Sequence, residues 1–375
     1  MHSIGANGDQ IRHGMDSASE HAYTQRRDPV NIPVHVMGKA WARLMKLTGT
    51  VCLLSCLLCT PTLGDERSDR DTDGEFPTEP LTLLIGFNPG GSTDTQGQAL
   101  ASVLSQELAQ PVQLIYYPGM GGAAAAAMLA SSQDQGQVML FGTSLPFFFT
   151  PLVTETSYDL DSFRFVGAVA LDQTALVTGP DTPFDNWQDM LSYARERGEL
   201  IYATQTTQDR YIMEVIATNE GINVRAVPTS GGAGMAPLVI SGDADLAFSG
   251  GTHSGYTESG EIRVLASLAD ERLASYPEAP TIRELGYDLN MHAYRLIAVP
   301  ADTPDHQVER LGAALRSAVE DPGFIAVTED QLQMPVVSLD EESVTRTLRQ
   351  QVEEYQRVMD TTGTPEEFSP PALDR

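Results

Sequence analysis

Residues 81–94 read LTLLIGFNPGGSTD, and this stretch decides the predicted fold. Its opening, residues 81–87, is an apolar run of the kind that forms a buried strand, and a helical pattern follows through Leu108. Gly90 and Gly91 stand between the two, where residues without a side chain let the backbone turn tightly. A strand, a glycine turn and a helix in this order are the first unit of an α/β fold.

The same alternation of short apolar runs with helical patterns continues along the chain. Near-continuous apolar strands separated by helices indicate parallel sheets that are covered on both faces. The runs are too many for one small sheet, so we predict two α/β domains. The further runs lie at residues 112–117, 138–142, 164–170, 175–178, 200–203, 224–228, 244–248, 262–268 and 295–299. Two helical patterns, at residues 308–319 and 344–355, close the chain.

The composition is that of a folded protein with room for two domains: 375 residues, of which 41% are hydrophobic and 20% charged. A disordered or collagen-like chain is therefore excluded. The 51 acidic residues exceed the 23 basic ones and give a net charge of −28, which argues against a nucleic-acid partner or an anionic membrane surface. Lys39 and Lys46 are the only lysines, so the chain beyond them has none for a phosphate-binding loop or a Schiff base.

Residues 1–64 are predicted to be a leader that ends in a secretory signal peptide. Three basic residues precede an apolar run at residues 47–63, which is shorter than the roughly 20 residues of a membrane-spanning helix. Small residues near its end favour cleavage before Asp65, and residues 65–76 form a charged linker. An uncleaved N-terminal anchor is the alternative. Export would place the protein in the periplasm.

The three cysteines, Cys52, Cys56 and Cys59, all lie within that apolar run. The chain beyond it is therefore expected to have no disulfide, no cysteine nucleophile and no thiolate metal ligand. Lipidation of Cys56 or Cys59, which would make the protein a lipoprotein, is a second interpretation of the same residues.

The glycine turn after the first strand is the first candidate binding element. Ser92 and Thr93 offer hydroxyl groups at a helix start, where free N–H groups and the positive end of the helix dipole suit a carboxylate or a phosphate. The alternative is a purely structural turn, in which Ser92 caps the helix and Asp94 complements its dipole.

Two further turns follow later strands. Residues 117–125, YPGMGGAAA, match the dinucleotide pattern G-x-G-x-x-A, but the next strand does not end in the acidic residue that would hold a ribose. Residues 142–146, GTSLP, lack the final glycine of a G-x-S-x-G nucleophile elbow. Thr143 and Ser144 are therefore interpreted as hydrogen-bonding groups, and neither a nucleotide nor a hydrolase site is favoured.

The turn at residues 203–210, ATQTTQDR, lies in the second half of the chain. Like the first turn, it stands between a predicted strand and a predicted helix and carries polar side chains. Arg210 could pair with a ligand carboxylate or, four residues along a helix, with Glu214. The histidines beyond the leader stand at no spacing typical of a metal site, so no metal is expected.

From residue 79 to residue 359 the chain resembles the Bug, or TctC-type, extracytoplasmic substrate-binding proteins of tripartite tricarboxylate transporters. Residues 81–94 are similar to the family's strand and P-x-G-G-x-x-D turn, and YPGMGGAAAA, residues 117–126, to its R-P-G-A-G-G segment. The other matching segments, in family order, lie at residues 140–144, 227–248, 258–287 and 296–324.

The resemblance implies an α/β type II periplasmic-binding-protein fold, in which two α/β domains are joined by two crossing segments and enclose a ligand cleft. Domain I would comprise residues 77–172 and 295–375, and domain II residues 173–294. It also implies a monomer that captures a small carboxylate and presents it to a membrane permease, with no catalysis, no cofactor and no nucleic acid. A receptor for a membrane sensor, or an enzyme using Ser144, are the rival interpretations.

The resemblance further implies which residues bind the ligand. They lie in the first turn, the turn after Gly142 and the loop of the second domain: Phe87, Asn88, Pro89, Gly90, Gly91, Ser92, Thr93, Asp94, Thr143, Ser144, Gln205, Thr206, Thr207, Gln208 and Ser249. The second-domain loop departs from the family pattern A-S-x-G-x-G-S-x-x-H, because it has neither glycine nor histidine. We predict that Gln205 and Thr207 nonetheless contact the ligand, whose identity cannot be transferred from the family.

Overall fold

A computed structural model describes residues 76–134 and 136–362. The predicted leader, its cleavage site and the three cysteines lie outside these residues. Within them, no helix combines the length and the apolar character that crossing a bilayer requires.

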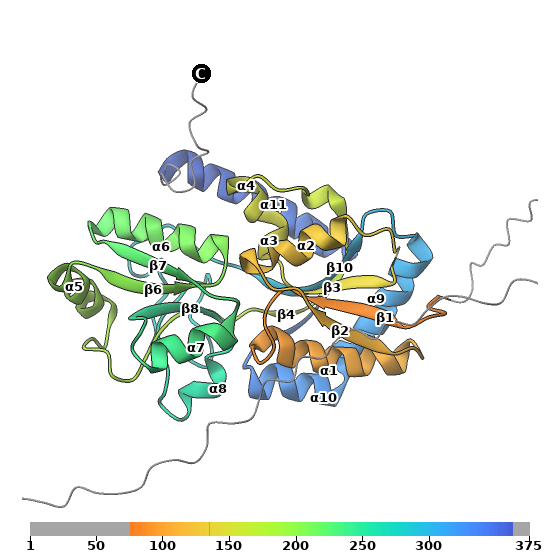
Figure 1. Ribbon diagram of the computed structural model, residues 1–375, viewed down its shortest axis with the longest axis horizontal. Helices are drawn as coiled ribbons and strands as arrows, with labels where there is room; N and C mark the ends of the chain where they lie inside the picture. The colour runs from red at the N-terminus through yellow and green to blue at the C-terminus, as the bar shows by residue number, and fades with distance from the viewer. Residues whose placement is uncertain (1–75, 135, 363–375) are drawn as a thin grey trace, which may run out of the picture. The chain divides into compact units, whose positions relative to one another are not determined.

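A six-stranded sheet with helices on both faces makes up what we call the first lobe (Figure 1). Its strand order is β11-β4-β10-β3-β1-β2. One face packs against α1, α9 and α10, and the other against α2, α3 and α11. The strands are β1 (Leu81–Ile85), β2 (Val112–Tyr116), β3 (Val138–Thr143), β4 (Phe163–Leu171), β10 (Tyr294–Pro300) and β11 (Val336–Asp340). The helices are α1 (Ser92–Glu107), α2 (Ala123–Ala130), α3 (Leu145–Phe148), α4 (Thr150–Val153), α9 (Asp305–Glu320), α10 (Pro322–Ile325) and α11 (Glu341–Thr362).

A five-stranded sheet with the order β7-β6-β8-β5-β9 makes up the second lobe. Helices α5 and α6 pack on one face, and α7 packs on the other. The strands are β5 (Thr174–Thr178), β6 (Leu200–Thr204), β7 (Val224–Pro228), β8 (Leu246–Gly250) and β9 (Arg263–Ser267). The helices are α5 (Trp187–Arg197), α6 (Thr207–Glu220), α7 (Gly232–Ile240) and α8 (Ser254–Thr257).

The prediction of parallel sheets is wrong for part of each lobe. Strand β1 is parallel to β2 and β3, and β6 is parallel to β7 and β8. Strands β4 and β10 are antiparallel to each other, and β5 is antiparallel to both β8 and β9. The chain enters or leaves a lobe through β4, β5, β9 and β10, so no helix returns it to the same end of the sheet between paired strands of this set, as a parallel pair would require. The edge strand β11 was not predicted, because its residues are half-exposed and form no continuous apolar run.

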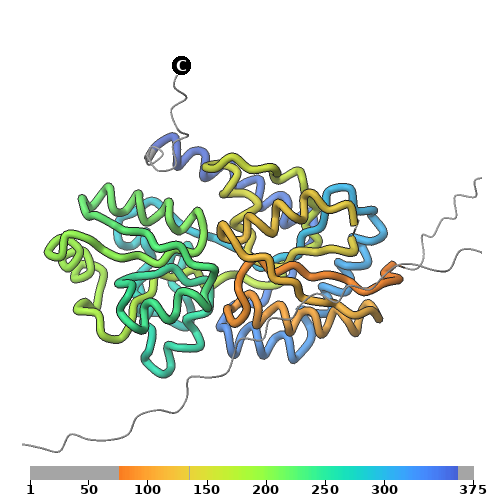
Figure 2. The backbone as a smooth tube through the Cα atoms, in the orientation of Figure 1, coloured from red at the N-terminus to blue at the C-terminus, as the bar shows by residue number. Residues whose placement is uncertain are grey.

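The chain passes twice between the lobes, from β4 to β5 through residues 172–173 and from β9 to β10 through residues 268–293. The two crossings run side by side, as the tube in Figure 2 shows, and the Asp172 N–H donates to the Ala293 carbonyl at 2.9 Å. Two α/β lobes with two crossing segments are the architecture that the resemblance implies. The division into separate domains at residues 172 and 294 stays a prediction.

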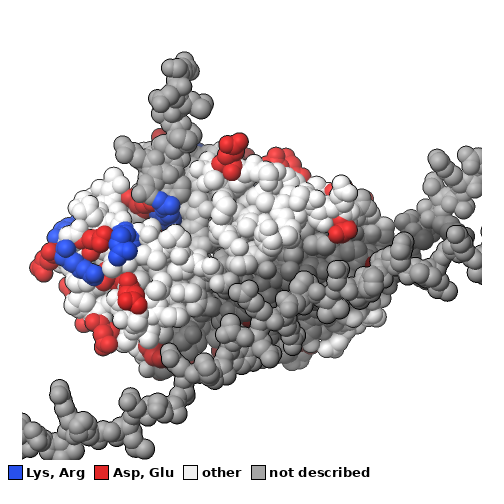
Figure 3. Space-filling view, viewed as in Figure 1, with Lys and Arg blue, Asp and Glu red and all other residues white. Residues whose placement is uncertain are grey.

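The charged side chains of the second lobe form local ion pairs. On the face seen in Figure 3, arginine side chains gather over the second lobe and lie among acidic ones. Arg195 pairs with Glu220 at 2.7 Å and Arg197 with Asp245 at 2.5 Å. Because carboxylates flank these arginines, they provide no basic surface of the kind that binds a polyanion.

Candidate functional site

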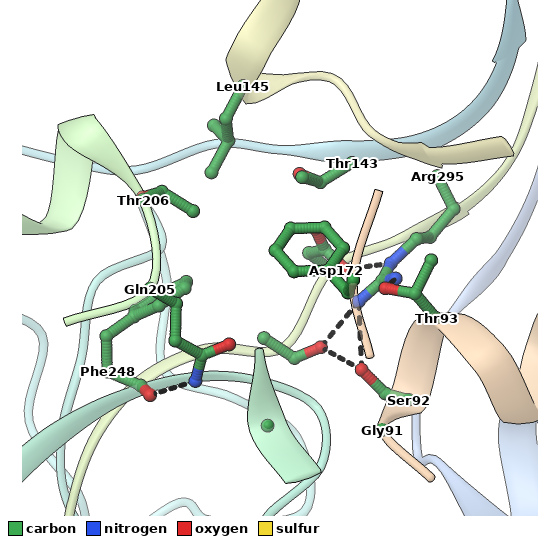
Figure 4. Close-up of a pocket in the computed structure, with 13 residues that line it drawn as sticks. Gly91, Ser92, Thr93, Thr143, Leu145, Asp172, Gln205, Thr206, Phe248 and Arg295 are labelled. Carbon is green, nitrogen blue, oxygen red and sulfur yellow. Dashed lines mark hydrogen bonds and ion pairs between the residues drawn. The ribbon is translucent and has the colours of Figure 1, made fainter. Parts of the chain in front are cut away.

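Loops from both lobes meet at a small pocket with a cavity volume of about 20 Å³, room for about one water molecule (Figure 4). Most of the lining residues lie at the ends of strands or the starts of helices. They are Phe87, Gly91, Ser92, Thr93, Thr143, Leu145, Asp172, Gln205, Thr206, Gly232, Phe248, Gly250 and Arg295.

The first loop, between β1 and α1, is held in shape by the Asp94 carboxylate. This group accepts hydrogen bonds from the Gly90 N–H (2.7 Å), the Tyr116 hydroxyl (2.6 Å) and the Gln98 amide (2.8 Å). Burial by itself raises the pKa of Asp94, but the three hydrogen bonds outweigh it and hold that pKa below its usual value. The Asp94 charge is thus used within the loop and does not line the pocket.

Of the two alternatives for the first turn, the one in which Ser92 caps the helix is wrong. Gly91 is the N-cap of α1 and makes no side-chain cap, and Ser92 is already the first helical residue. The Ser92 hydroxyl donates instead to the Gly250 carbonyl of the second lobe (3.0 Å), and its N–H donates to the Thr252 hydroxyl (3.1 Å). The first loop therefore touches the second lobe directly.

Thr143, the last residue of β3, presents a buried hydroxyl to the pocket. Within the described part of the chain this oxygen has no hydrogen-bond partner, although the side chain is almost fully buried. A buried hydroxyl without a partner is costly, so this group is suited to meet a ligand. The neighbouring Ser144 faces elsewhere, because its hydroxyl accepts the Tyr294 N–H at 3.1 Å.

The second-lobe loop, between β6 and α6, is organised by Asp209. Its carboxylate accepts hydrogen bonds from the Thr206 hydroxyl (2.7 Å), the Gln205 N–H (3.2 Å) and the Tyr202 hydroxyl (2.8 Å), and Thr206 caps α6 in return. Complete burial raises the pKa of Asp209 in spite of these hydrogen bonds. Gln205 and Thr206 are thereby fixed at the pocket wall.

The other predicted residues of this loop point away from the pocket. The Gln208 amide donates to the Tyr355 hydroxyl of α11, and the Thr207 hydroxyl lies 3.4 Å from that of Thr150. Arg210 pairs with Glu214 at 2.8 Å, which is the helical alternative that the sequence left open.

The glycine-rich segment at residues 119–122 approaches this loop rather than a nucleotide. Gly121 has φ +64°, and a Cβ placed on it would lie 2.8 Å from the Thr206 Cα. Glycine at this position thus allows the backbones of the two lobes to come together.

A buried ion pair in the pocket, between Asp172 at the end of β4 and Arg295 in β10, was not predicted from the sequence. Their side chains are 2% and 3% exposed. Arg295 also bonds the hydroxyls of Ser92 (3.0 Å) and Thr93 and the Gly250 carbonyl (2.7 Å). The available signal was one arginine at the start of an otherwise apolar strand, since a buried charge requires a partner.

The structure brings about half of the predicted site residues to the pocket wall. Those that line it are Phe87, Gly91, Ser92, Thr93, Thr143, Gln205 and Thr206. Those outside the lining are Asn88, Pro89, Gly90, Asp94, Ser144, Thr207, Gln208 and Ser249. The lining residues that were not predicted are Leu145, Asp172, Gly232, Phe248, Gly250 and Arg295.

The described residues hold no candidate metal centre. In residues 76–134 and 136–362, no three His, Cys, Asp or Glu side chains are grouped so that they could hold a metal ion. Ser249, a predicted ligand contact, is fully buried and hydrogen-bonded to the His253 ring at 3.0 Å.

The model of the tripartite tricarboxylate transporter family receptor, TctC, matches residues 97–364. The chain belongs to this family. Among the relatives of this chain, the UPF0065 protein in the gbd 5' region of Cupriavidus necator is 28% identical over 254 residues, which cover 67% of this chain and 77% of that protein. Protein BugT of Bordetella pertussis is 25% identical over 318 residues, which cover 78% of this chain and 91% of BugT.

Solved structures of binding proteins share the TctC fold of this chain. The periplasmic binding protein BugD is 21% identical with a TM-score of 0.69, and the match covers 77% of this chain and 99% of BugD. MatC from Rhodopseudomonas palustris, solved with bound malate, is 20% identical with a TM-score of 0.68 over 76% of this chain and 99% of MatC. A second R. palustris protein, solved with adipate, is 23% identical with a TM-score of 0.68 over 77% and 99%. The predicted fold class is confirmed.

Proposed function

We propose that this protein is an extracytoplasmic solute-binding protein that captures a small carboxylate and delivers it to the permease of a tripartite tricarboxylate transporter. The observation that carries the proposal is the meeting of two helix starts at one pocket. Gly91 and Ser92 begin α1 in the first lobe, and Thr206 caps α6 in the second. The first N–H groups of a helix have no intrahelical acceptor and carry partial positive charge, so an anion between two such ends is stabilised.

The Thr143 hydroxyl completes a set of donors for one carboxylate. Its oxygen has no partner within the described residues, and it lines the same pocket as the two helix starts. Each hydrogen bond to a charged carboxylate contributes on the order of 1.5–3 kcal/mol, so three or four of them account for micromolar binding after the costs of association. The pocket-lining residues among those predicted are therefore our proposed ligand contacts.

The net charge of −28 does not oppose this function. At physiological salt, exposed charges more than about 8 Å away are largely screened, so the donors within the pocket decide the binding of a small anion. The malate and adipate bound by two proteins of the same fold support a carboxylate as the ligand class.

A thermal-shift screen of mono-, di- and tricarboxylates with the purified protein tests the proposal. A ligand at 100 times its dissociation constant adds about 2.7 kcal/mol to the stability of the folded state and raises the melting temperature. No shift with any carboxylate would contradict the proposed ligand class. Consumption of a bound carboxylate would instead favour an enzyme.

Delivery to a permease and signalling to a membrane sensor predict different cellular results. We expect deletion of the gene to abolish uptake of the radiolabelled carboxylate that binds in the screen. Unchanged uptake with a lost transcriptional response to that carboxylate would favour the sensor. Cell fractionation with N-terminal sequencing tests the proposed periplasmic location and the cleavage before Asp65.

A further inference from the structure

Resting on the proposed function, we infer that the pocket selects a ligand with one carboxylate and a second group that donates hydrogen bonds, an ammonium or a hydroxyl, and that it disfavours a second carboxylate. The inference comes from the charges of Asp172 and Arg295 and from the polar atoms beside them.

Arg295 is already occupied by the protein. Its Nε bonds the Asp172 carboxylate, one terminal nitrogen bonds the Thr93 hydroxyl, and the other bonds both the Ser92 hydroxyl and the Gly250 carbonyl. Dashed lines in Figure 4 mark these interactions. A guanidinium has five N–H donors, and binding a carboxylate in bidentate geometry uses two of them. The partners just named use four of these donors, so a ligand carboxylate could bind the guanidinium in bidentate geometry only by displacing Asp172 or the neighbouring Thr93, Ser92 and Gly250 groups.

No side chain that lines the pocket is an uncompensated cation. Asp172 and Arg295 offset each other, and the two helix starts, each equivalent to roughly half a positive charge, already carry Asp94 and Asp209 in their first turns. One ligand carboxylate can use the remaining helix-start N–H groups and the Thr143 hydroxyl. A second carboxylate would find no cation free to pair with it, and on the Asp172 side of the ion pair it would meet a desolvated like charge.

The remaining polar atoms at this wall are acceptors. The Gln205 Nε2 donates to the Phe248 carbonyl, which can only accept, so the amide is oriented with its oxygen away from Phe248. Figure 4 shows this oxygen facing the pocket. Asp172 is likewise an acceptor, and one of its two oxygens serves Arg295. Acceptors at a pocket wall are satisfied by ligand donors and not by a ligand carboxylate.

The test on the unaltered protein compares ligands of equal length by calorimetry. The four-carbon set is succinate, 4-hydroxybutyrate and 4-aminobutyrate, and the five-carbon set is glutarate, 5-hydroxypentanoate and 5-aminopentanoate. We expect a donor-bearing ligand to bind at least tenfold more tightly than the dicarboxylate of its set. Comparison of the hydroxy acid with the amino acid of each set then identifies the preferred donor, a hydroxyl or an ammonium. Tighter or equal binding of the dicarboxylates overturns the inference alone, whereas no binding by all six overturns the proposed function with it.

Asp172→Asn tests the residue that sets the preference. It frees Arg295, so the ratio of the dicarboxylate dissociation constant to that of the donor-bearing ligand should fall at least tenfold. Asp185→Asn is the matched control, because Asp185 pairs with Arg263 (2.9 Å) at an exposed site outside the pocket. If Asp172→Asn fails to fold, the neutral double variant Asp172→Asn/Arg295→Gln should likewise lose the preference against dicarboxylates. An unchanged ratio in the folded variant overturns the inference, since a merely structural Asp172 would alter all ligands alike.

Discussion

Gly121 of the first lobe lies directly against Thr206, the N-cap of α6 in the second, so closely that a methyl group on Gly121 would lie 2.8 Å from the Thr206 Cα. The atom in the way belongs to the backbone and cannot rotate aside. The two lobes can therefore come this close only because residue 121 has no side chain.

Gly121→Ala should weaken ligand binding at least tenfold, because the added methyl keeps the second-lobe loop away from the pocket. Gly221→Ala is the control, since Gly221 has a similar φ of +61° against +64° for Gly121, and a Cβ placed on Gly221 would meet no atom within 4 Å. Both variants carry the same backbone strain, so any further loss of stability of Gly121→Ala in urea unfolding measures the clash with Thr206. Equal ligand affinities in calorimetry would contradict the role of the contact.

Thr143→Val should lower ligand affinity about tenfold or more, because it removes a hydroxyl that we place against the ligand carboxylate. Valine has the same shape, and the hydroxyl has no partner within the described chain, so stability without ligand should not fall. Thr303→Val is the matched control, as Thr303 carries another buried hydroxyl without a partner in the described residues and lies outside the pocket. A loss of affinity in both variants would point to a general effect of the substitution.

Gln205→Ala should weaken binding, since the Gln205 amide lines the pocket. Thr207→Ala tests the prediction that Thr207 also contacts the ligand. In the structure the Thr207 hydroxyl lies 3.4 Å from the Thr150 hydroxyl. We expect the larger loss with Gln205→Ala, measured as the dissociation constant of the best carboxylate from the thermal screen. Unchanged affinity in both variants would remove the second-lobe loop from the binding site.

His253 should make the protein less stable as the pH falls. Its ring is fully buried, and desolvation lowers its pKa from 6.5 to about 3. The unfolded chain takes up a proton near pH 6.5 while the native state does so only near pH 3, so stability is lost as the pH falls through this window, by up to about 1.4 kcal/mol per pH unit.

The variant His253→Gln separates this contribution from that of the carboxylates. Urea unfolding of both proteins at pH 7, 5.5 and 4 gives the difference in stability at each pH. The wild-type protein should lose stability relative to the variant as the pH falls, whereas a constant difference would show that His253 does not titrate with unfolding.

Strands and turns that depend only on their own residues were predictable from the sequence. The run at residues 81–87 contains β1, and the glycines after it do form the turn that enters the pocket. Strand direction was not predictable, since an apolar run such as residues 295–299 reads the same whether its partner is parallel or antiparallel. The direction is set by the crossings between the lobes.

The Asp172–Arg295 pair shows why about half of the residues that line the pocket were not predicted. The two residues are far apart in sequence, and each reads alone as the polar end of an apolar run. Only the pairing of β4 with β10 brings them together. Thr143, by contrast, was predictable, because a hydroxyl at the end of a buried strand lies at the sheet edge where ligands bind.

The contacts between the lobes have a consequence for evolution and engineering. The Asn88 N–H donates to the Ser230 carbonyl (3.0 Å) and the Ser92 N–H to the Thr252 hydroxyl (3.1 Å), so these contacts use main-chain groups and one small side chain. The groups that we propose discriminate between ligands are the larger side chains of Asp172 and Gln205. The Gln205 side chain bonds the Phe248 carbonyl of its own lobe, whereas Asp172 holds Arg295, which also bonds the Gly250 carbonyl across the lobes. A library varied at Gln205 should therefore change the ligand preference that we propose while the contacts between the lobes persist, as a family of biosensors requires.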